Sequence, residues 1–191
     1  MKKYIVVSHI AIISLTSIIG LSACSKGTVE AARSPVPYSA SLKAPADCIH
    51  TKILATIVQT VPQAQSIDTR WQPTAGTELA DFLNNDGIAC SYGLQSAEIG
   101  ATIKWVSGAQ QLFSNRVDGW MQQGYRKVDI PNIPPAPTYF LYKPQSASQE
   151  FQIWQVQILV NDLWISINSS YLHTLNEGAS LIKAALASAT Q

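Results

Sequence analysis

The clearest periodic pattern in the chain lies in residues 151–169, where apolar and polar residues alternate on both sides of Asn161-Asp162. Alternation with a period of two is typical of half-buried strands, and a two-residue Asn-Asp loop favours a tight hairpin turn. The register then pairs Val160 with Leu163 and places nearly every β-branched residue on one face. The opposite face carries Gln155, Gln157, Ser166 and Asn168, with Leu159 and Trp164 near the turn.

Three other segments predict strands. Residues 88–94 alternate in the same way and place Cys90 and Tyr92 on the inner face. A turn at residues 96–100 joins this segment to residues 101–106, so the two are expected to form a hairpin. Residues 139–142 predict a further strand, whereas the Pro-rich loop at 131–137 cannot pair as a central strand and is expected at the surface.

Apolar residues at three- and four-residue spacing predict four helices. The first is capped by Asp47, buries Ile49 and Val58 among others, and ends at Pro62. A short helix follows Thr77 and stops at the turn 84–87.

The other two helices each follow a predicted capping box, in which a hydroxyl and a side chain three residues later bond each other's backbone amides. Ser107 with Gln110 begins the third helix, whose buried stripe runs from Leu112 to Met121. Thr174 with Glu177 begins the fourth. Strand runs framed by helices indicate an α+β fold, an antiparallel sheet flanked by helices (an α/β sandwich), in a single domain over residues 47–191.

The N-terminal segment predicts an export signal. Residues 1–23 combine the basic pair Lys2-Lys3, an apolar run and small residues before Cys24. The run Leu21-Ser22-Ala23-Cys24 matches a bacterial lipobox, which predicts diacylation (palmitate-type) of Cys24 and a lipid anchor on the extracytoplasmic face of the cell membrane. The alternative is an uncleaved, membrane-spanning signal anchor. Residues 24–46, rich in Ser, Ala and Pro, predict a flexible tether.

Composition agrees with a folded domain. Hydrophobic residues make up 47% of the chain and charged residues 13%, which excludes a disordered or coiled-coil protein. Without Lys2 and Lys3 the chain keeps eleven basic and twelve acidic residues. This balance gives no electrostatic attraction to nucleic acid.

Cys48 and Cys90 are the two cysteines that remain after lipidation of Cys24. An even pair in an oxidising compartment predicts a disulfide, here between the first helix and the strand at residues 88–94. The alternative is a reactive thiol.

Candidate catalytic residues are few. The two histidines outside the predicted leader and the scattered carboxylates do not predict a metal site, and we expect no cofactor. Asp47 and His50 lie one turn apart, but Thr51 points elsewhere on a helix, so a cap and a surface histidine are the simpler interpretation. His173 lies between a strand end and a helix start, without a nucleophile elbow nearby. An envelope hydrolase that uses His173 or His50 is therefore the alternative hypothesis.

The amide-rich sheet face is the candidate binding surface. Its residues are Gln155, Gln157, Ser166, Asn168 and Trp164, joined by Trp71. Neutral amides beside an aromatic ring suit a glycan, a peptide or another uncharged ligand. The alternatives are a polar face that meets only water and an apolar-ligand carrier with a cavity between sheet and helices.

The lipobox, the tether, the cysteine at position 48 and the run Gly87-Ile88-Ala89-Cys90-Ser91-Tyr92-Gly93 together resemble small secreted actinobacterial lipoproteins, whose functions are mostly uncharacterised. The resemblance implies a PsbP-like α/β sandwich and supplies no catalytic residue. With no catalytic set in the chain, we expect a non-enzymatic binding or interaction module of the cell envelope, whose partner is an envelope protein, a glycan or an apolar ligand.

Overall fold

The structure is a computed structural model that describes residues 42–129, 138–144 and 153–189. The predicted leader, Cys24, most of the tether and the Pro-rich loop at 131–137 lie outside the described residues. In the part of the chain that is described, no helix has the length and apolar character that a bilayer crossing requires.

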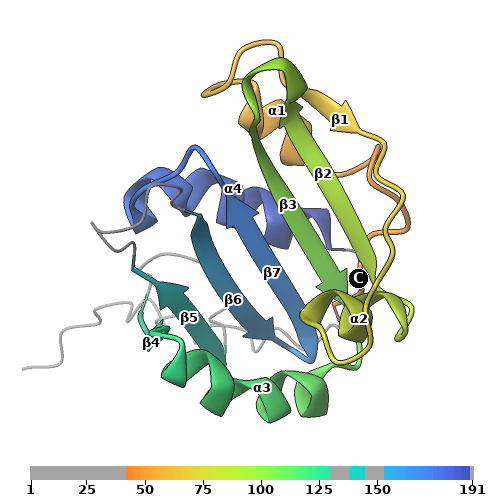
Figure 1. The fold of residues 1–191 in the computed structure, drawn as a ribbon, viewed down its shortest axis with the longest axis vertical. Helices are drawn as coiled ribbons and strands as arrows, with labels where there is room; N and C mark the ends of the chain where they lie inside the picture. The colour runs from red at the N-terminus through yellow and green to blue at the C-terminus, as the bar shows by residue number, and fades with distance from the viewer. Residues whose placement is uncertain (1–41, 130–137, 145–152, 190–191) are drawn as a thin grey trace, which may run out of the picture. The chain divides into compact units, whose positions relative to one another are not determined.

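Seven strands of the described residues form one antiparallel sheet (Figure 1). They are β1 (Gln65–Ile67), β2 (Ile88–Leu94), β3 (Ile99–Val106), β4 (Arg126–Lys127), β5 (Tyr139–Lys143), β6 (Trp154–Val160) and β7 (Leu163–Ser169). Their order across the sheet is β1-β2-β3-β7-β6-β5-β4. The predicted strands are confirmed, whereas β1 and β4 are too short to leave a periodic pattern.

Helices lie on both faces of this sheet. They are α1 (Ile53–Ile57), α2 (Glu78–Leu83), α3 (Gln110–Gln122) and α4 (Leu175–Ser188), with a single 3-10 turn, η1 (Gln95–Ala97), in the β2–β3 connection. In Figure 1, α4 lies behind the sheet, whereas α2 and α3 lie in front of its lower end. We call these two sides the back face and the front face. The predicted α+β fold with an antiparallel sheet is confirmed.

The β6–β7 hairpin forms as the sequence predicts. Asn161 and Asp162 both have positive φ, 44° and 64°, which matches the twist of the two strands, and Val160 pairs with Leu163. The turn also starts α3, because the Asp162 carboxylate accepts the Gln110 amide at 2.7 Å. The predicted capping box is therefore wrong: the Ser107 hydroxyl instead accepts the amide of Ala44 at 2.9 Å.

The main core lies between the back face and helices α1 and α4. It holds one side chain in two from each long strand, including Cys90, Ile103, Trp105, Val156, Ile158, Ile165 and Ile167. The Trp105 ring nitrogen donates to the Ala185 carbonyl at 3.0 Å. Gly178 of α4 lies against Trp154 so closely that a Cβ would come within 2.2 Å of the ring. Sheet and α4 are therefore in direct contact, without room for a ligand at Gly178.

The predicted extent of the first helix is wrong, and so is the predicted burial of Ile49, Val58 and Met121. The first helix is only five residues long, and Ile49 is 82% exposed, because Asp47 closes a separate turn by accepting the amides of Ile49 and His50. Val58, directly after α1, and Met121 of α3 are also exposed.

The packed chain also begins earlier than the predicted boundary at residue 47. Leu42 is buried in the main core, and the Ala44 amide is bonded by Ser107 as described above. Proline and alanine in this stretch hid the contact, because an extended segment can pack without any periodicity.

Candidate functional site

The lower half of the front face carries a buried polar cluster under α2. Glu78 of α2 places its carboxylate over the sheet, where it accepts Lys104 Nζ at 2.5 Å, Ser166 Oγ at 2.7 Å and Gln157 Nε2 at 2.9 Å. Gln157 Oε1 in turn accepts the Trp164 ring nitrogen at 2.9 Å. Burying a charge is costly unless it is paired and hydrogen-bonded, and each of these groups has its partner. We call these five residues the Glu78 cluster.

The Glu78 cluster changes the interpretation of the amide-rich face. Gln157, Ser166 and Trp164 were predicted to face water or a ligand, but all three are buried. Trp164 packs within an aromatic group, with Phe82 of α2 at 4.2 Å and Trp120 of α3 at 5.4 Å between ring centroids. These three predicted binding residues are therefore part of the interior.

Trp71 is also engaged by the protein itself. Its ring nitrogen donates to the Ala89 carbonyl of β2 at 2.9 Å, and the side chain is half-buried. This bond satisfies a carbonyl of β2 at a position beyond the reach of the short strand β1, which pairs only with Ser91, Tyr92 and Gly93. Trp71 therefore bonds the backbone of β2 near the sheet edge, and the structure does not bring it to Asn168.

Tyr125 adds a titratable group beside the Glu78 cluster. Burial raises the pKa of its hydroxyl to about 12. A hydrogen bond with Gln157 has the opposite, smaller effect on this pKa. A pKa that is higher in the folded state than in the unfolded state means that the folded state binds the proton more tightly. This contribution to stability is complete below pH 10, the ordinary pKa, and is lost as the pH rises through 12.

We therefore expect the free energy of unfolding to fall between pH 10 and 12, and to fall less in Tyr125→Phe. Denaturant titrations at several pH values measure this. Burial also raises the pKa of Tyr171 to about 12, and it raises the pKa of Tyr92 and of Tyr142. These three tyrosines contribute the part of the fall that Tyr125→Phe leaves. A Tyr125→Phe protein with the same pH dependence as the wild type would contradict the assignment.

Among the residues that the structure describes, no helix lies in front of the upper half of the front face (Figure 1). One row of side chains crosses four strands here, because the registers pair Ser91 with Thr102, Thr102 with Asn168, and Asn168 with Gln155. All four side chains are half-exposed. We call them the neutral row.

The side chains of the neutral row bond one another in pairs. Gln155 Nε2 donates to Asn168 Oδ1 at 3.2 Å, and the hydroxyls of Ser91 and Thr102 lie 3.3 Å apart. Amide and hydroxyl groups of this kind have more donors and acceptors than these two bonds use. The remaining groups are available to a ligand or to water.

A cleft of about 380 Å³ opens over this part of the sheet. Ser91, Thr102 and Asn168 line it, Ile67 and Ile153 contribute aliphatic side chains from β1 and from the start of β6, and the β2–β3 hairpin tip contributes Gln95, Glu98 and Ile99. Among the described residues that line it, Glu98 is the only charged one. The volume lies within the range of ligand pockets, which are commonly apolar with a few placed polar groups. We call it the open cleft.

Two of the predicted binding residues therefore lie on this open part of the sheet, and their role in binding stays a prediction. Asn168 lines the open cleft, and Gln155 donates a hydrogen bond to Asn168. The other two members of the row, Ser91 and Thr102, were not among the predicted binding residues. Their polar alternation in the β2–β3 hairpin was visible in the sequence. Their place beside Asn168 depends on the pairing of β3 with β7, which no local pattern encodes.

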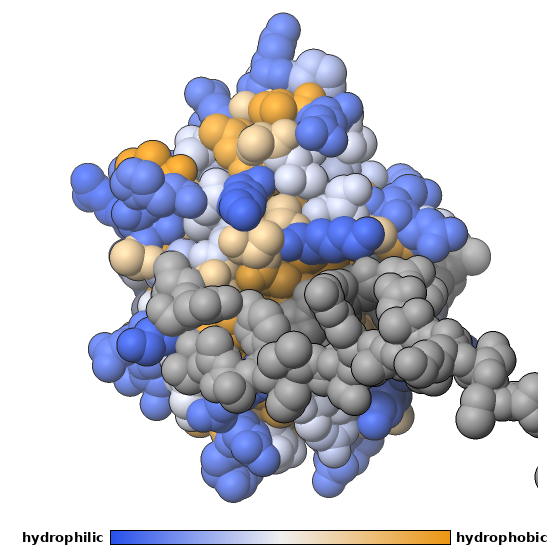
Figure 2. Space-filling view, turned by 180° about the vertical axis from the view of Figure 1, so that it is seen from behind, coloured by the Kyte–Doolittle hydropathy of each residue, from blue (hydrophilic) through white to orange (hydrophobic). Residues whose placement is uncertain are grey.

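The opposite surface is less distinctive. Seen from behind, its described part mixes apolar patches with hydrophilic side chains (Figure 2). Helices α1 and α4 already cover the strands on this side. The candidate site is therefore on the front face, where the strands themselves are open.

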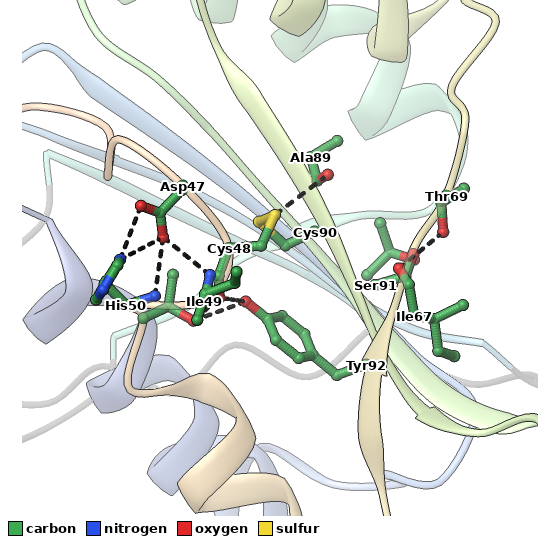
Figure 3. The surroundings of a disulfide bond; sticks show 12 residues. Asp47, Cys48, Ile49, His50, Ile67, Thr69, Ala89, Cys90, Ser91 and Tyr92 are labelled. Atoms are coloured by element: carbon green, nitrogen blue, oxygen red, sulfur yellow. Dashed lines mark hydrogen bonds and ion pairs between the residues drawn. A yellow bond between two sulfur atoms is a disulfide. The ribbon is translucent and has the colours of Figure 1, made fainter.

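The predicted disulfide is present and anchors the N-terminal turn to β2 (Figure 3). Cys48 and Cys90 have their Cα atoms 5.5 Å apart. Tyr92 lies beside the bridge, and its hydroxyl donates to the Cys48 carbonyl at 2.7 Å and lies 2.6 Å from Thr51 Oγ1. Burial raises the pKa of Tyr92. The bond from Tyr92 and the bridge hold the same turn, so this region is structural.

The two histidine candidates each lie beside a carboxylate that closes a turn or caps a helix. His50 Nδ1 lies 2.8 Å from Asp47, but its side chain is 85% exposed and the nearby Thr51 hydroxyl is bonded to Tyr92. Hydrogen bonds from His50 lower the pKa of Asp47. The backbone amide of His173 donates to Glu177 at 2.9 Å, which lowers the pKa of that carboxyl and completes the confirmed cap of α4.

No group of three or more His, Cys, Asp or Glu side chains suited to a metal ion occurs in the described ranges 42–129, 138–144 and 153–189. Comparisons with protein-family models, with curated proteins and with solved structures found no match.

Proposed function

We propose that the chain is a lipid-anchored, extracytoplasmic lipoprotein whose domain acts as a binding module of the cell envelope, with the open cleft as its ligand site. The observation that carries this proposal is the neutral row, which lies on a part of the sheet that none of the described helices covers. Polar groups that are buried in a protein need hydrogen-bond partners from the protein itself. The half-exposed side chains of the neutral row can instead form their remaining hydrogen bonds with a ligand or with water.

The chemistry of the open cleft favours an uncharged ligand. Its described lining residues place hydroxyl and amide groups on the floor and isoleucine side chains at the sides, with Glu98 as the one charged residue among them. A phosphate or carboxylate ligand would meet no cation among these lining residues. A peptide, a glycan or another neutral molecule with both apolar and hydrogen-bonding parts fits this lining better.

The disulfide supports the proposed location. Disulfides persist in oxidising compartments outside the cytoplasm, and the Cys48–Cys90 bridge fits such a compartment. The lipobox at Cys24 predicts the anchor itself. The proposal differs from both alternatives in where it places the ligand. The hydrolase alternative uses His50 or His173, neither of which is among the described lining residues of the open cleft. The carrier alternative places an apolar ligand between the sheet and the helices, whereas the open cleft lies on the front face of the sheet.

Replacing Cys24 tests the anchor. We expect Cys24→Ser to lose the labelled palmitate that the wild type incorporates, because the Cys24 thiol is the acylation site of the lipobox. Metabolic labelling with palmitate measures this, with Cys48→Ser/Cys90→Ser as a control that keeps the lipobox. A wild-type protein that incorporates no palmitate would favour the uncleaved signal anchor.

Replacing Asn168 tests the cleft. We expect Asn168→Ala to bind the cleft ligand about tenfold more weakly, because a hydrogen-bonding side chain on the floor is lost. The probe is a soluble extract of the cell envelope, titrated into isotope-labelled protein while amide shifts of Ser91 and Thr102 are followed by NMR.

The matched control is Asn115→Ala. It removes the same kind of bond on α3, where Gln111 Nε2 donates to Asn115 Oδ1 at 2.8 Å. We expect Asn115→Ala to bind as the wild type does. Equal binding by wild type, Asn115→Ala and Asn168→Ala would show that the ligand does not use the open cleft.

A further inference from the structure

The strand β1 leaves one side of the sheet open. Its three residues pair with β2, and Ile67 is the register partner of Ser91. Within the described residues no strand pairs with the other side of β1. Gln65 and Ser66 are exposed. Figure 1 shows β1 at the outer edge of the sheet, beside the hairpin formed by β2 and β3. Such an edge presents unpaired backbone donors and acceptors, which can bind another extended chain.

This edge adjoins the open cleft. Ile67 lines the cleft and is the register partner of Ser91, the first member of the neutral row. In an added strand, alternate side chains would point to the front face. A strand bound to β1 would therefore place one side chain next to Ile67 at the cleft, while its backbone bonds the edge.

We infer that the ligand of the open cleft is an extended, uncharged segment of an envelope protein, which adds to β1 as a further strand and places an aliphatic side chain beside Ile67. The inference rests on the proposed function and specifies its ligand class. Strand addition is a common mode of peptide recognition, in which main-chain bonds give affinity and a pocket for alternate side chains gives specificity.

The lining favours a peptide over a glycan. Among the described lining residues, Tyr92 is the only aromatic one, and it is buried with its hydroxyl bonded to Cys48 on the other side of the sheet. The described part of the lining therefore presents no aromatic face to a sugar ring. Ile67, Ile153 and Ile99 instead offer aliphatic contacts, and an aliphatic side chain in this position gains from burial without a charge to desolvate.

The experiment uses two synthetic probes and the full chain in detergent micelles. The first probe is the capped peptide acetyl-Thr-Val-Thr-Val-Thr-amide, and the second has the same sequence with alternate backbone nitrogens methylated. We expect the first to shift the amide signals of β1 and Asn168 and to slow hydrogen exchange in β1. We expect the methylated probe to bind at least tenfold more weakly, because it cannot donate to the edge.

A pair of variants separates side-chain from backbone contacts. Ile67→Thr keeps a β-branched side chain in β1 but loses aliphatic contact, and we expect it to bind the first probe several-fold more weakly. Val58→Thr makes the same kind of change at an exposed position after α1, and we expect wild-type affinity.

Four results would overturn the inference. Equal binding of both probes, with shifts at Asn168, would mean that the cleft binds through side chains alone, and the proposed function would stand. Shifts with tri-N-acetylchitotriose but not with the peptide would indicate a glycan, and the proposed function would again stand. Protection of β1 by concentration-dependent dimerisation would identify a second copy as the occupant. Failure of the peptide to shift any signal would exclude this ligand class. The titration with the envelope extract would then still test whether the open cleft binds another ligand.

Discussion

The Cys48→Ala/Cys90→Ala protein is expected to unfold with a free energy about 4 kcal/mol below that of the wild type. The bridge joins residues 42 positions apart, and it restricts the unfolded chain more than the folded one. In the folded state it also attaches the turn at Cys48 to the buried residue Cys90. Without the bridge, only the Tyr92 and Thr51 contacts and the packing of α1 hold this turn to the sheet.

Urea titrations of oxidised wild type and of the double variant measure this difference. Wild type under reducing conditions is a second comparison, and it should lose nearly the same free energy as the double variant. Cys24→Ser is the matched control, because it removes a cysteine without removing the bridge. Equal stability of the double variant and the oxidised wild type would show that the bridge is not structural.

Lys104→Met is expected to lose about 3 kcal/mol of stability, at the lower end of the range for breaking a buried ion pair. The Lys104 side chain is 8% exposed and that of Glu78 is 21% exposed. Removing the ammonium leaves the Glu78 carboxylate charged under α2, with only the dipoles of Ser166 and Gln157 to compensate. The lower end is expected because Glu78 keeps some contact with water.

A second substitution tests that reason. Glu78→Gln in the Lys104→Met background removes the uncompensated charge, so we expect the double variant to regain most of the loss. Arg116→Met breaks the more exposed pair with Asp81 and is expected to cost about 1 kcal/mol or less. Chemical denaturation measures all four proteins. A double variant as unstable as Lys104→Met would show that buried charge is not the cause.

Local patterns in the sequence predicted the parts of the fold that local chemistry determines. The β6–β7 hairpin is one such part, since Asn161 and Asp162 determine the turn and alternation determines the face. The disulfide is another, since only Cys48 and Cys90 remained for it. The first helix failed because Asp47 bonds a separate turn, a choice between two local structures that apolar spacing does not decide.

The candidate site was predicted only in part, because tertiary contacts divide the amide-rich face. Asn168 and Gln155 stay open, whereas Gln157, Ser166 and Trp164 are covered. The cover comes from Glu78 and Phe82 of α2, which lies far away in sequence. Alternation shows which face a side chain takes, but it does not show which half of that face a helix will cover.

The most direct test of the central claim is a native mass measurement of the full chain isolated from its own cell envelope, with the denatured mass recorded beside it. The account predicts a reproducible extra mass that is lost on denaturation, is greatly reduced in Asn168→Ala and is retained in Asn115→Ala. A bare chain in all three proteins, or an extra mass that Asn168→Ala leaves unchanged, would contradict the open cleft as the ligand site.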